Sequence, residues 1–149
     1  MIEAVGLEAA ALMAALHAQA FPRPWSAEEI AKLLANPAVF ALVSGKTQAQ
    51  GFAMGWTAAG DAELLTVAVV PEARRRGLGA ALVTAAGVAA LVRGAASMHL
   101  EVAEDNEAAR ALYAKLGYKE AGRRHAYYAG ERGPIDAIVM RRTLPRPIV

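Results

Sequence analysis

The segment PEARRRGLGA, residues 71–80, places three consecutive arginines directly before a Gly-Leu-Gly tripeptide. An apolar run, ELLTVAVV at 63–70, precedes it, and a second, LGAALVTAAGVAALV, occupies 78–92. The first run is rich in β-branched residues and ends at Pro71, so it predicts a central strand buried on both faces. The second predicts a buried helix, because it is shorter than the roughly 20 residues that span a bilayer. The arginines therefore lie in a loop between a strand and the start of a helix.

This loop has the chemistry of an anion site. Gly77 and Gly79 would let the backbone approach a ligand closely, and the free amides and dipole of a helix N-terminus favour negative charge. Arg74, Arg75 and Arg76 could add charge-assisted hydrogen bonds to phosphate. The loop has neither the Lys-Ser/Thr of a Walker loop nor the G-x-G-x-x-G of a dinucleotide fold. A pyrophosphate is the expected ligand. The alternatives are a solvated turn and a nucleic-acid patch, and no extended basic stripe in the sequence supports the nucleic-acid patch.

The bulk composition predicts one globular domain spanning residues 1–149. The chain is 56% hydrophobic and 20% charged, with a formal net charge of +2. The lack of cysteine excludes disulfides and a cysteine nucleophile, and the three histidines (His17, His99 and His125) do not have metal-ligand spacing. The first charges are acidic, which argues against a signal peptide. We expect a cytoplasmic monomer or weak dimer that binds no metal, nucleic acid or membrane.

Hydrophobic periodicity and turn residues predict a mixed order of elements. Strands are expected at 2–5, 39–45, 51–56, 63–70, 98–104, 118–128 and 135–144, helices at 7–20, 26–34, 78–92 and 106–116, and turns at 45–50 and 129–134. The strand–helix–strand order in the middle implies parallel strands joined by a right-handed crossover. The predicted fold class is α/β (α+β), with a mixed sheet and helices on both faces.

Several helix ends carry recognisable signals. Ser26 and Glu29 have the spacing of a capping box. Asn106 is the expected N-cap of the last helix, and Gly117 is its expected stop.

Two motifs resemble the GCN5-related N-acetyltransferase (GNAT) family. Arg74-x-x-Gly77-x-Gly79 is similar to the family's Arg/Gln-x-x-Gly-x-Gly/Ala loop, which binds the pyrophosphate of acetyl-CoA. Residues 106–118 match a second pattern, N-x-x-A-x-x-L-Y-x-x-x-G-[FY], at the expected distance downstream. AFPRPWSAEE at 20–29 and RRHAYY at 123–128 further resemble the RimI-type ribosomal-protein alanine N-acetyltransferases.

The resemblance implies a largely antiparallel sheet whose central parallel strand pair is splayed by a bulge. Backbone groups of the central strand would bind the pantetheine arm of acetyl-CoA like an added strand, and one amide would polarise the thioester carbonyl. Asn106 would contact CoA, although capping alone would explain it. The implied acetyl-CoA residues are Val67, Ala68, Val69, Arg74, Arg75, Arg76, Gly77, Leu78, Gly79, Ala80 and Asn106.

Glu101 is the candidate base for acetyl transfer, a reaction that requires a neutral amine. An α-amino group has a pKa near 8, against about 10.4 for lysine, so a carboxylate acting through water suffices for a protein N-terminus. Strand alternation places Glu101 on one face with His99, opposite the apolar residues of 98–102. From the residues alone, Glu101 could equally lie on a solvated strand face. In the RimI-type family, the matching glutamate is the proton acceptor.

Tyr113 is the candidate acid. It lies two helical turns beyond Asn106 and shares a face with Ala109, Leu112 and Leu116. It could simply be a packed aromatic side chain. The resemblance implies that its hydroxyl donates a proton to the departing CoA sulfur.

The residues expected near the acceptor each have two possible roles, one in binding and one in structure. Tyr127 and Tyr128, with Asp136, could line an acceptor groove, or they could form a cross-strand aromatic pair beside a surface charge. Trp25 could shape the entrance or anchor a loop. The FPRPWS loop is two residues longer than the family's usual form, and AGERGPIDA is a looser turn.

The expected function is acetylation of the N-terminal α-amine of a protein, most simply an alanine-starting ribosomal protein. Acetylation of a small-molecule amine or a lysine side chain is the alternative, since one fold serves many acceptors. An acyl-CoA-binding module without chemistry is a third reading, against which the presence of both Glu101 and Tyr113 argues.

Overall fold

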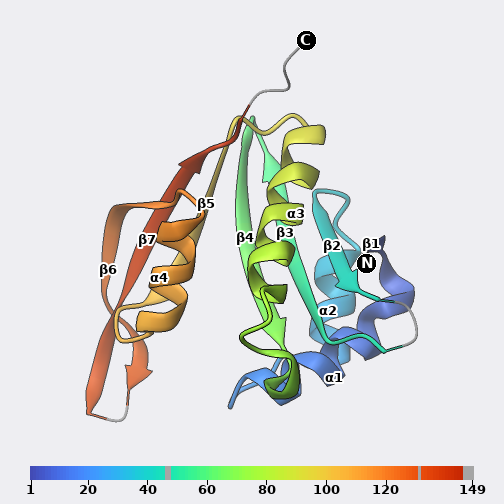
Figure 1. Cartoon of the computed structure of the whole chain (residues 1–149), viewed down its shortest axis with the longest axis horizontal. Helices are drawn as coiled ribbons and strands as arrows, with labels where there is room; N and C mark the ends of the chain where they lie inside the picture. The colour runs from blue at the N-terminus through green and yellow to red at the C-terminus, as the bar shows by residue number, and fades with distance from the viewer. Residues whose placement is uncertain (46–47, 131, 146–149) are drawn as a thin grey trace.

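A computed structural model of the chain describes residues 1–45, 48–130 and 132–145 (Figure 1). Within these ranges seven strands form one sheet in the order β1-β2-β3-β4-β5-β7-β6. The expected turns at 45–50 and 129–134 include residues 46, 47 and 131, which lie outside the described residues. The strands are β1 (Ile2–Val5), β2 (Val39–Ser44), β3 (Gly51–Ala58), β4 (Asp61–Val69), β5 (Ser97–Ala103), β6 (Lys119–Gly130) and β7 (Gly133–Thr143). The helices are α1 (Ala10–Ala20), α2 (Ala27–Leu34), α3 (Leu78–Val92) and α4 (Glu107–Lys115), with short 3₁₀ turns η1 (Leu7–Ala9) and η2 (Pro71–Ala73).

The predicted fold class is confirmed. Strands β4 and β5 pair in parallel, and all other neighbouring strands pair antiparallel. The β4–α3–β5 unit joins adjacent parallel strands, as expected. The β5–α4–β6 unit does not, because β7 returns between β5 and β6 and pairs with both.

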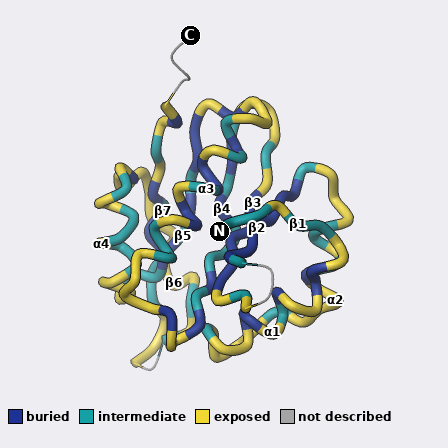
Figure 2. Tube along the Cα trace, turned by 45° about the vertical axis from the view of Figure 1, so that its right-hand side comes forward, coloured by how far each residue is buried: buried dark blue, intermediate teal, exposed yellow. Residues whose placement is uncertain are grey.

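Helices cover both faces of the sheet, and each face has its own apolar core (Figure 2). Helices α3 and α4 lie over one face, where Leu82, Met98 and Leu100 are almost fully buried. Helices α1 and α2 pack on the other face, mainly against β2, β3 and β4. The opposite half of that second face, formed by β5, β7 and β6, therefore remains available for a functional site.

A bulge in β4 changes which core its side chains enter. Met54 pairs with Thr66 and the next residue, Gly55, pairs with Leu64, so Leu65 has no partner on β3. Before the bulge, the side chain of Leu64 packs in the core beneath α3. After the bulge, the side chain of Ala68 packs in the core beneath α1, although residues an even number of positions apart lie on the same face of a regular strand. An unpaired extra residue shifts the two-residue alternation of a strand in this way. The bulge implied by the family resemblance is thus present in this chain.

The parallel pair is joined over only three registers. Asp61 pairs with Ser97, Ala62 with Met98, and Glu63 with His99, after which the strands diverge (Figure 1). The divergence leaves Leu65, Thr66 and Val67 only partly buried, so the expectation that this strand would be buried on both faces holds only in part.

Polar side chains bind the joined end of β4 and β5. Ser97 donates to Asp61 at 2.8 Å, and Arg141 of β7 donates to the same Ser97 hydroxyl at 2.7 Å. His99 contacts Asp61 through Nδ1 at 3.3 Å and Glu63 through Nε2 at 3.1 Å. We call these five residues the apex cluster, because they lie where the two halves of the sheet meet.

The local signals read from the sequence are present. The Ser26 hydroxyl accepts from the Glu29 amide at 3.1 Å, and the Glu29 carboxylate accepts from the Ser26 amide at 3.2 Å. Asn106 caps α4 by accepting from the Ala109 amide at 3.2 Å. Gly117 ends that helix with a left-handed φ of 96°. These caps determine where α2 and α4 begin and where α4 ends.

Loss of the Asp61 charge should weaken the apex cluster in a pH-dependent way. Partial burial raises the pKa of Asp61, but hydrogen bonds from Ser97 and Ala62, with His99 and Arg141 nearby, outweigh it and leave the pKa below its usual value. A carboxyl with a depressed pKa contributes stability above its unfolded pKa, near 3.9, and loses it as the pH falls through the folded pKa. Asp61→Asn should lower the free energy of unfolding by about 1 kcal/mol at pH 7.

Urea denaturation at pH 7 and near pH 3 measures this deficit, which should shrink at the lower pH as wild-type Asp61 protonates. Glu120→Gln, which changes an exposed carboxylate on β6, is the control. An equal deficit at both pH values would show that the Asp61 charge contributes nothing to the cluster.

Candidate active site

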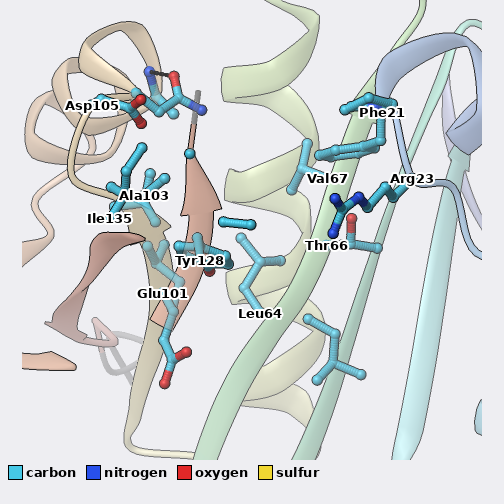
Figure 3. A pocket seen from close by; sticks show the side chains of 18 of the residues that line it. Phe21, Arg23, Leu64, Thr66, Val67, Glu101, Ala103, Asp105, Tyr128 and Ile135 are labelled. Atoms are coloured by element: carbon cyan, nitrogen blue, oxygen red, sulfur yellow. Dashed lines mark hydrogen bonds between the residues drawn. The ribbon is translucent and has the colours of Figure 1, made fainter. Parts of the chain in front are cut away.

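A cleft of about 1090 Å³ lies where β4 and β5 diverge. One wall comes from β4 and the α1–α2 loop, and the other from β5, α4 and the β6–β7 hairpin. In Figure 3, Thr66, Val67 and Arg23 lie on one wall and Glu101 and Tyr128 on the other. The bulge and the short parallel pairing together create this opening, because they stop β5 from continuing along β4.

Glu101 lines the cleft from β5. Its neighbours Leu100 and Val102 are buried in the α3 core, so Glu101 lies on the opposite face with His99, as strand alternation predicted. Its side chain is 20% exposed, and Oε1 lies 2.8 Å from Nε of Arg124 on β6. Glu101 is therefore an accessible carboxylate that also has a cationic neighbour, which the sequence did not indicate.

Tyr113 lines the same cleft from α4 and packs against the α3 core. Burial, with smaller effects from Tyr118 and Tyr128, raises the pKa of Tyr113 to about 12. The phenol is therefore protonated throughout the neutral range and can donate a proton. Among the described residues, we find no hydrogen-bond partner for its hydroxyl, so packing accounts for the ring but not for the polar group.

The arginine loop lies beyond the end of β4, outside the residues that line the cleft. Arg74 Nε donates to the Val69 carbonyl at 3.1 Å, which ties the loop back to the strand. Arg75 and Gly77 both have left-handed backbones, with φ of 64° and 79°. Arginine adopts this conformation at a cost that glycine avoids. Arg75, Arg76 and Gly77 are exposed immediately before the free amides of the first turn of α3.

Backbone groups of β4 are available on the side that faces the cleft. Val67, Ala68 and Val69 pair with β3 on one edge, while the pairing with β5 stops at Glu63. Val67 lines the cleft, and so does Asn106 at the start of α4. The structure thus brings the open strand edge, Asn106, Glu101 and Tyr113 around one cavity.

The α1–α2 loop is held by His17, a residue that the sequence did not single out. The His17 ring is 3% exposed and stacks between Phe21 and Trp25, with centroids 4.3 Å and 4.9 Å away. Its Nδ1 accepts from the Trp25 amide at 3.1 Å. Burial lowers the pKa of His17 although Glu29 partly opposes this, so the ring is neutral at pH 7. Trp25 thus anchors the loop and also lines the cleft.

Tyr128 lines the cleft, but Tyr127 and Asp136 do not. Tyr127 is 53% exposed and makes an edge contact with its neighbour Tyr128, with centroids 5.1 Å apart. Arg124 lies over the Tyr127 ring at 5.3 Å. The two tyrosines therefore differ in position: Tyr128 faces the cleft, whereas Tyr127 forms part of the surface.

The chain belongs to the acetyltransferase (GNAT) family, whose sequence profile matches residues 10–118. It is an N-acetyltransferase of this family, and membership implies acetyl-CoA as cosubstrate.

Within the family, the chain resembles the ribosomal protein bS18 alanine N-acetyltransferase of Escherichia coli K12. The two are 35% identical over 136 residues, which cover 90% of this chain and 92% of the relative. The crystal structure of the E. coli ribosomal-protein-S18-alanine N-acetyltransferase superposes with a TM-score of 0.84 at 30% identity, covering 99% of this chain and 96% of that one. An N-acetyltransferase from Staphylococcus aureus Mu50 shares the fold, with a TM-score of 0.81 at 18% identity over 97% and 98% of the two chains.

Within the described residues, no cluster of three or more His, Cys, Asp or Glu side chains could hold a metal ion. Likewise, none of the helices described is long and apolar enough to cross a membrane.

Tyr118 beside the site offers a stability test. Its ring is 2% exposed and packs edge-on against Tyr113 at 6.1 Å, and its hydroxyl is buried without a hydrogen-bond partner among the described residues. Tyr118→Phe keeps the ring and removes the unsatisfied group, so it should raise the free energy of unfolding by about 1 kcal/mol. Thermal and urea denaturation measure this change, with exposed Tyr127→Phe as the control. A clear loss of stability would mean that the hydroxyl is hydrogen-bonded in solution.

Proposed function

We propose that this enzyme acetylates the N-terminal α-amine of a protein, and that its acceptor is an alanine-starting ribosomal protein, bS18. The observation that carries this proposal is the likeness to the E. coli bS18 alanine N-acetyltransferase over 90% of the chain. An open cleft with a carboxylate on one wall supports it, because an amine at the end of a chain can enter such a space.

The residues present fit acetyl-CoA. The open edge of β4 at Val67–Val69, apart from the Val69 carbonyl that Arg74 binds, would bind the pantetheine arm by backbone hydrogen bonds, in the manner of an added strand. Exposed Arg75 and Arg76, with the amides from Gly77 into α3, would bind the pyrophosphate. Arg74 contributes differently, since its Nε already holds the Val69 carbonyl and so shapes the loop. Asn106 lines the cleft and would add a contact while capping α4.

Glu101 and Tyr113 would move the two protons of the reaction. Glu101 accepts a proton from the acceptor ammonium, directly or through water, which leaves a neutral amine. The amine nitrogen then forms a bond to the thioester carbon as the carbon–sulfur bond breaks, and the nitrogen releases its extra proton through water, which can reprotonate the Tyr113 phenolate. Tyr113 donates its phenolic proton to the departing sulfur. With a pKa raised to about 12, the Tyr113 phenol holds its proton at neutral pH, and a phenolate formed there recovers a proton readily.

The acceptor assignment is tested by mass spectrometry of peptides incubated with acetyl-CoA. The peptide begins with alanine and contains one internal lysine, and a copy with a blocked N-terminus is the control. Fragment ions should place the acetyl group on the α-amine alone. Acetyl on lysine, or turnover of free polyamines faster than of the peptide, would instead assign a lysine or small-molecule acceptor.

Substitution of the two proton-transferring groups should lower kcat without preventing folding. Glu101→Gln should reduce kcat by about 100-fold or more, and Tyr113→Phe by about 10- to 100-fold, because general acid–base catalysis contributes effects of this size. Steady-state kinetics measures both, and circular dichroism monitors the fold. Exposed Tyr127→Phe is the matched control for Tyr113→Phe. Unchanged turnover in Tyr113→Phe would exclude its role as the acid.

A further inference from the structure

Strand β6 contains an irregular segment directly beside the cleft. Arg124 pairs with Ala137 and Tyr128 pairs with Ile135, so residues 125–127 face the single residue Asp136 on β7. Ala126 within this segment has a left-handed φ of 54°. An alanine in this conformation is strained, because its Cβ approaches the backbone carbonyl. We call residues 125–127 the β6 bulge.

The Asp136 carboxylate holds this bulge in place. Its Oδ1 accepts from the Ala126 amide at 2.8 Å, and its Oδ2 accepts from Arg123 Nη1 at 2.8 Å. His125 Nδ1 lies 3.2 Å from Oδ2 as well. The hydrogen bonds from Arg123 and Ala126 hold the pKa of Asp136 below its usual range, so the carboxylate is ionised at neutral pH. One side chain thus compensates the strained residue at the centre of the bulge.

The bulge determines which side chain enters the cleft. In a regular ladder continuing from Arg124 and Ala137, Ala126 would lie opposite Ile135. The two extra residues place Tyr128 there instead, and because their number is even, Tyr128 remains on the same face as Arg124. That face is the one that carries Glu101, and both Tyr128 and Ile135 line the cleft. Asp136, by contrast, is absent from the lining and acts from outside it.

The same carboxylate is linked through Arg123 to the loop that follows β5. Arg123 Nη1 also lies 2.9 Å from Oε1 of Glu104, and the Glu104 amide donates to the Asp136 carbonyl at 2.9 Å. Glu104 precedes Asn106 in the loop that enters α4. The bulge is therefore held against the β5–α4 loop and does not depend on the hairpin alone.

We propose that Asp136 is a positioning residue for the acceptor: by holding the β6 bulge, it places Tyr128 on the wall of the cleft that the acceptor amine approaches. This role rests on the proposed function, since it requires that the acceptor enter this cleft. Asp136 itself touches neither acceptor nor acetyl-CoA. Removal of the Asp136 side chain should therefore raise the KM for the acceptor and have little effect on the KM for acetyl-CoA.

Steady-state kinetics of Asp136→Ala tests the proposal with the alanine-starting peptide. The KM for the peptide should rise about tenfold, while kcat and the KM for acetyl-CoA change less than about threefold. Tyr128→Ala should have a similar effect. If Asp136 acts through Tyr128, the double variant should be no worse than the more affected single variant, because coupled residues do not add. Additive effects, or an unchanged peptide KM in Asp136→Ala, would overturn the proposal.

Two further variants separate positioning from general loss of structure. Ala126→Gly in the Asp136→Ala background removes the strain and should recover part of the peptide KM, since glycine adopts a left-handed backbone readily. Asp136→Asn keeps an acceptor for the Ala126 amide and should give an intermediate effect. Glu120 lies on the same strand as the bulge, and its carboxylate is 2.6 Å from Arg110 of α4. Glu120→Ala breaks this ion pair; it is the matched control and should leave every constant unchanged. Failure of Ala126→Gly to recover any of the KM would contradict the role of the strained residue.

Amide hydrogen exchange provides a readout that does not depend on activity. The Ala126 amide should be protected in the wild type and should exchange at least about tenfold faster in Asp136→Ala, because its carboxylate partner is gone. Equal exchange would overturn the anchoring role. A wild type that fails to acetylate the peptide would instead overturn the proposed acceptor, and the exchange data would still decide whether Asp136 holds the bulge.

Discussion

The brief parallel pairing of β4 with β5 is the constraint on which the rest of the structure depends. The strands share three registers, from Asp61–Ser97 to Glu63–His99, and then separate. Longer pairing of β4 with β5 would close the cleft. Without any pairing, no backbone hydrogen bonds would join the two halves of the sheet between these strands. The apex cluster reinforces this short contact with side-chain hydrogen bonds and ion pairs that reach β7 through Arg141. The closed end of the cleft is therefore held by backbone pairing and by polar side chains together.

The two halves of the sheet contribute different chemistry to the cleft. The β4 half offers backbone groups, because the bulge at Leu65 and the loss of pairing expose the edge at Val67–Val69. The β5 half offers titratable side chains, with Glu101 on the strand and Tyr113 on α4. In the proposed mechanism, one wall binds the cosubstrate through backbone groups and the other transfers protons. Burial separates the roles further, since it keeps Tyr113 protonated while Glu101 stays accessible.

The rims of the cleft are built from less regular structure than its walls. His17 fixes the α1–α2 loop by stacking and by accepting from the Trp25 amide. Asp136 fixes the β6 bulge in a comparable way, with a side chain accepting from a strained backbone segment. Loops and bulges of this kind can vary while the sheet is retained, so acceptor choice can change while the open edge of β4 is kept.

The sequence alone determined the elements and the class of chemistry. Hydrophobic periodicity, the Ser26 capping box, the Asn106 cap and the glycine stop at Gly117 are local signals, and each was found where the residues predicted it. Alternation along β5 correctly placed Glu101 opposite its buried neighbours. The arginine loop and the 106–118 pattern predicted the family, which the comparisons confirm.

Only the tertiary structure decided how these parts meet. The insertion of β7 between β5 and β6, the pairing of Arg124 with Glu101, and the stacking of His17 all join residues far apart in the chain. The β6 bulge assigned Tyr128 to the cleft and Tyr127 to the surface, although the two are adjacent and identical in type. Short-range propensities specify where a strand or helix begins and ends, but they carry no information on register between strands. Register is set by the summed packing and hydrogen bonding of all strands together, and a bulge of one or two residues is enough to change which side chains form the site.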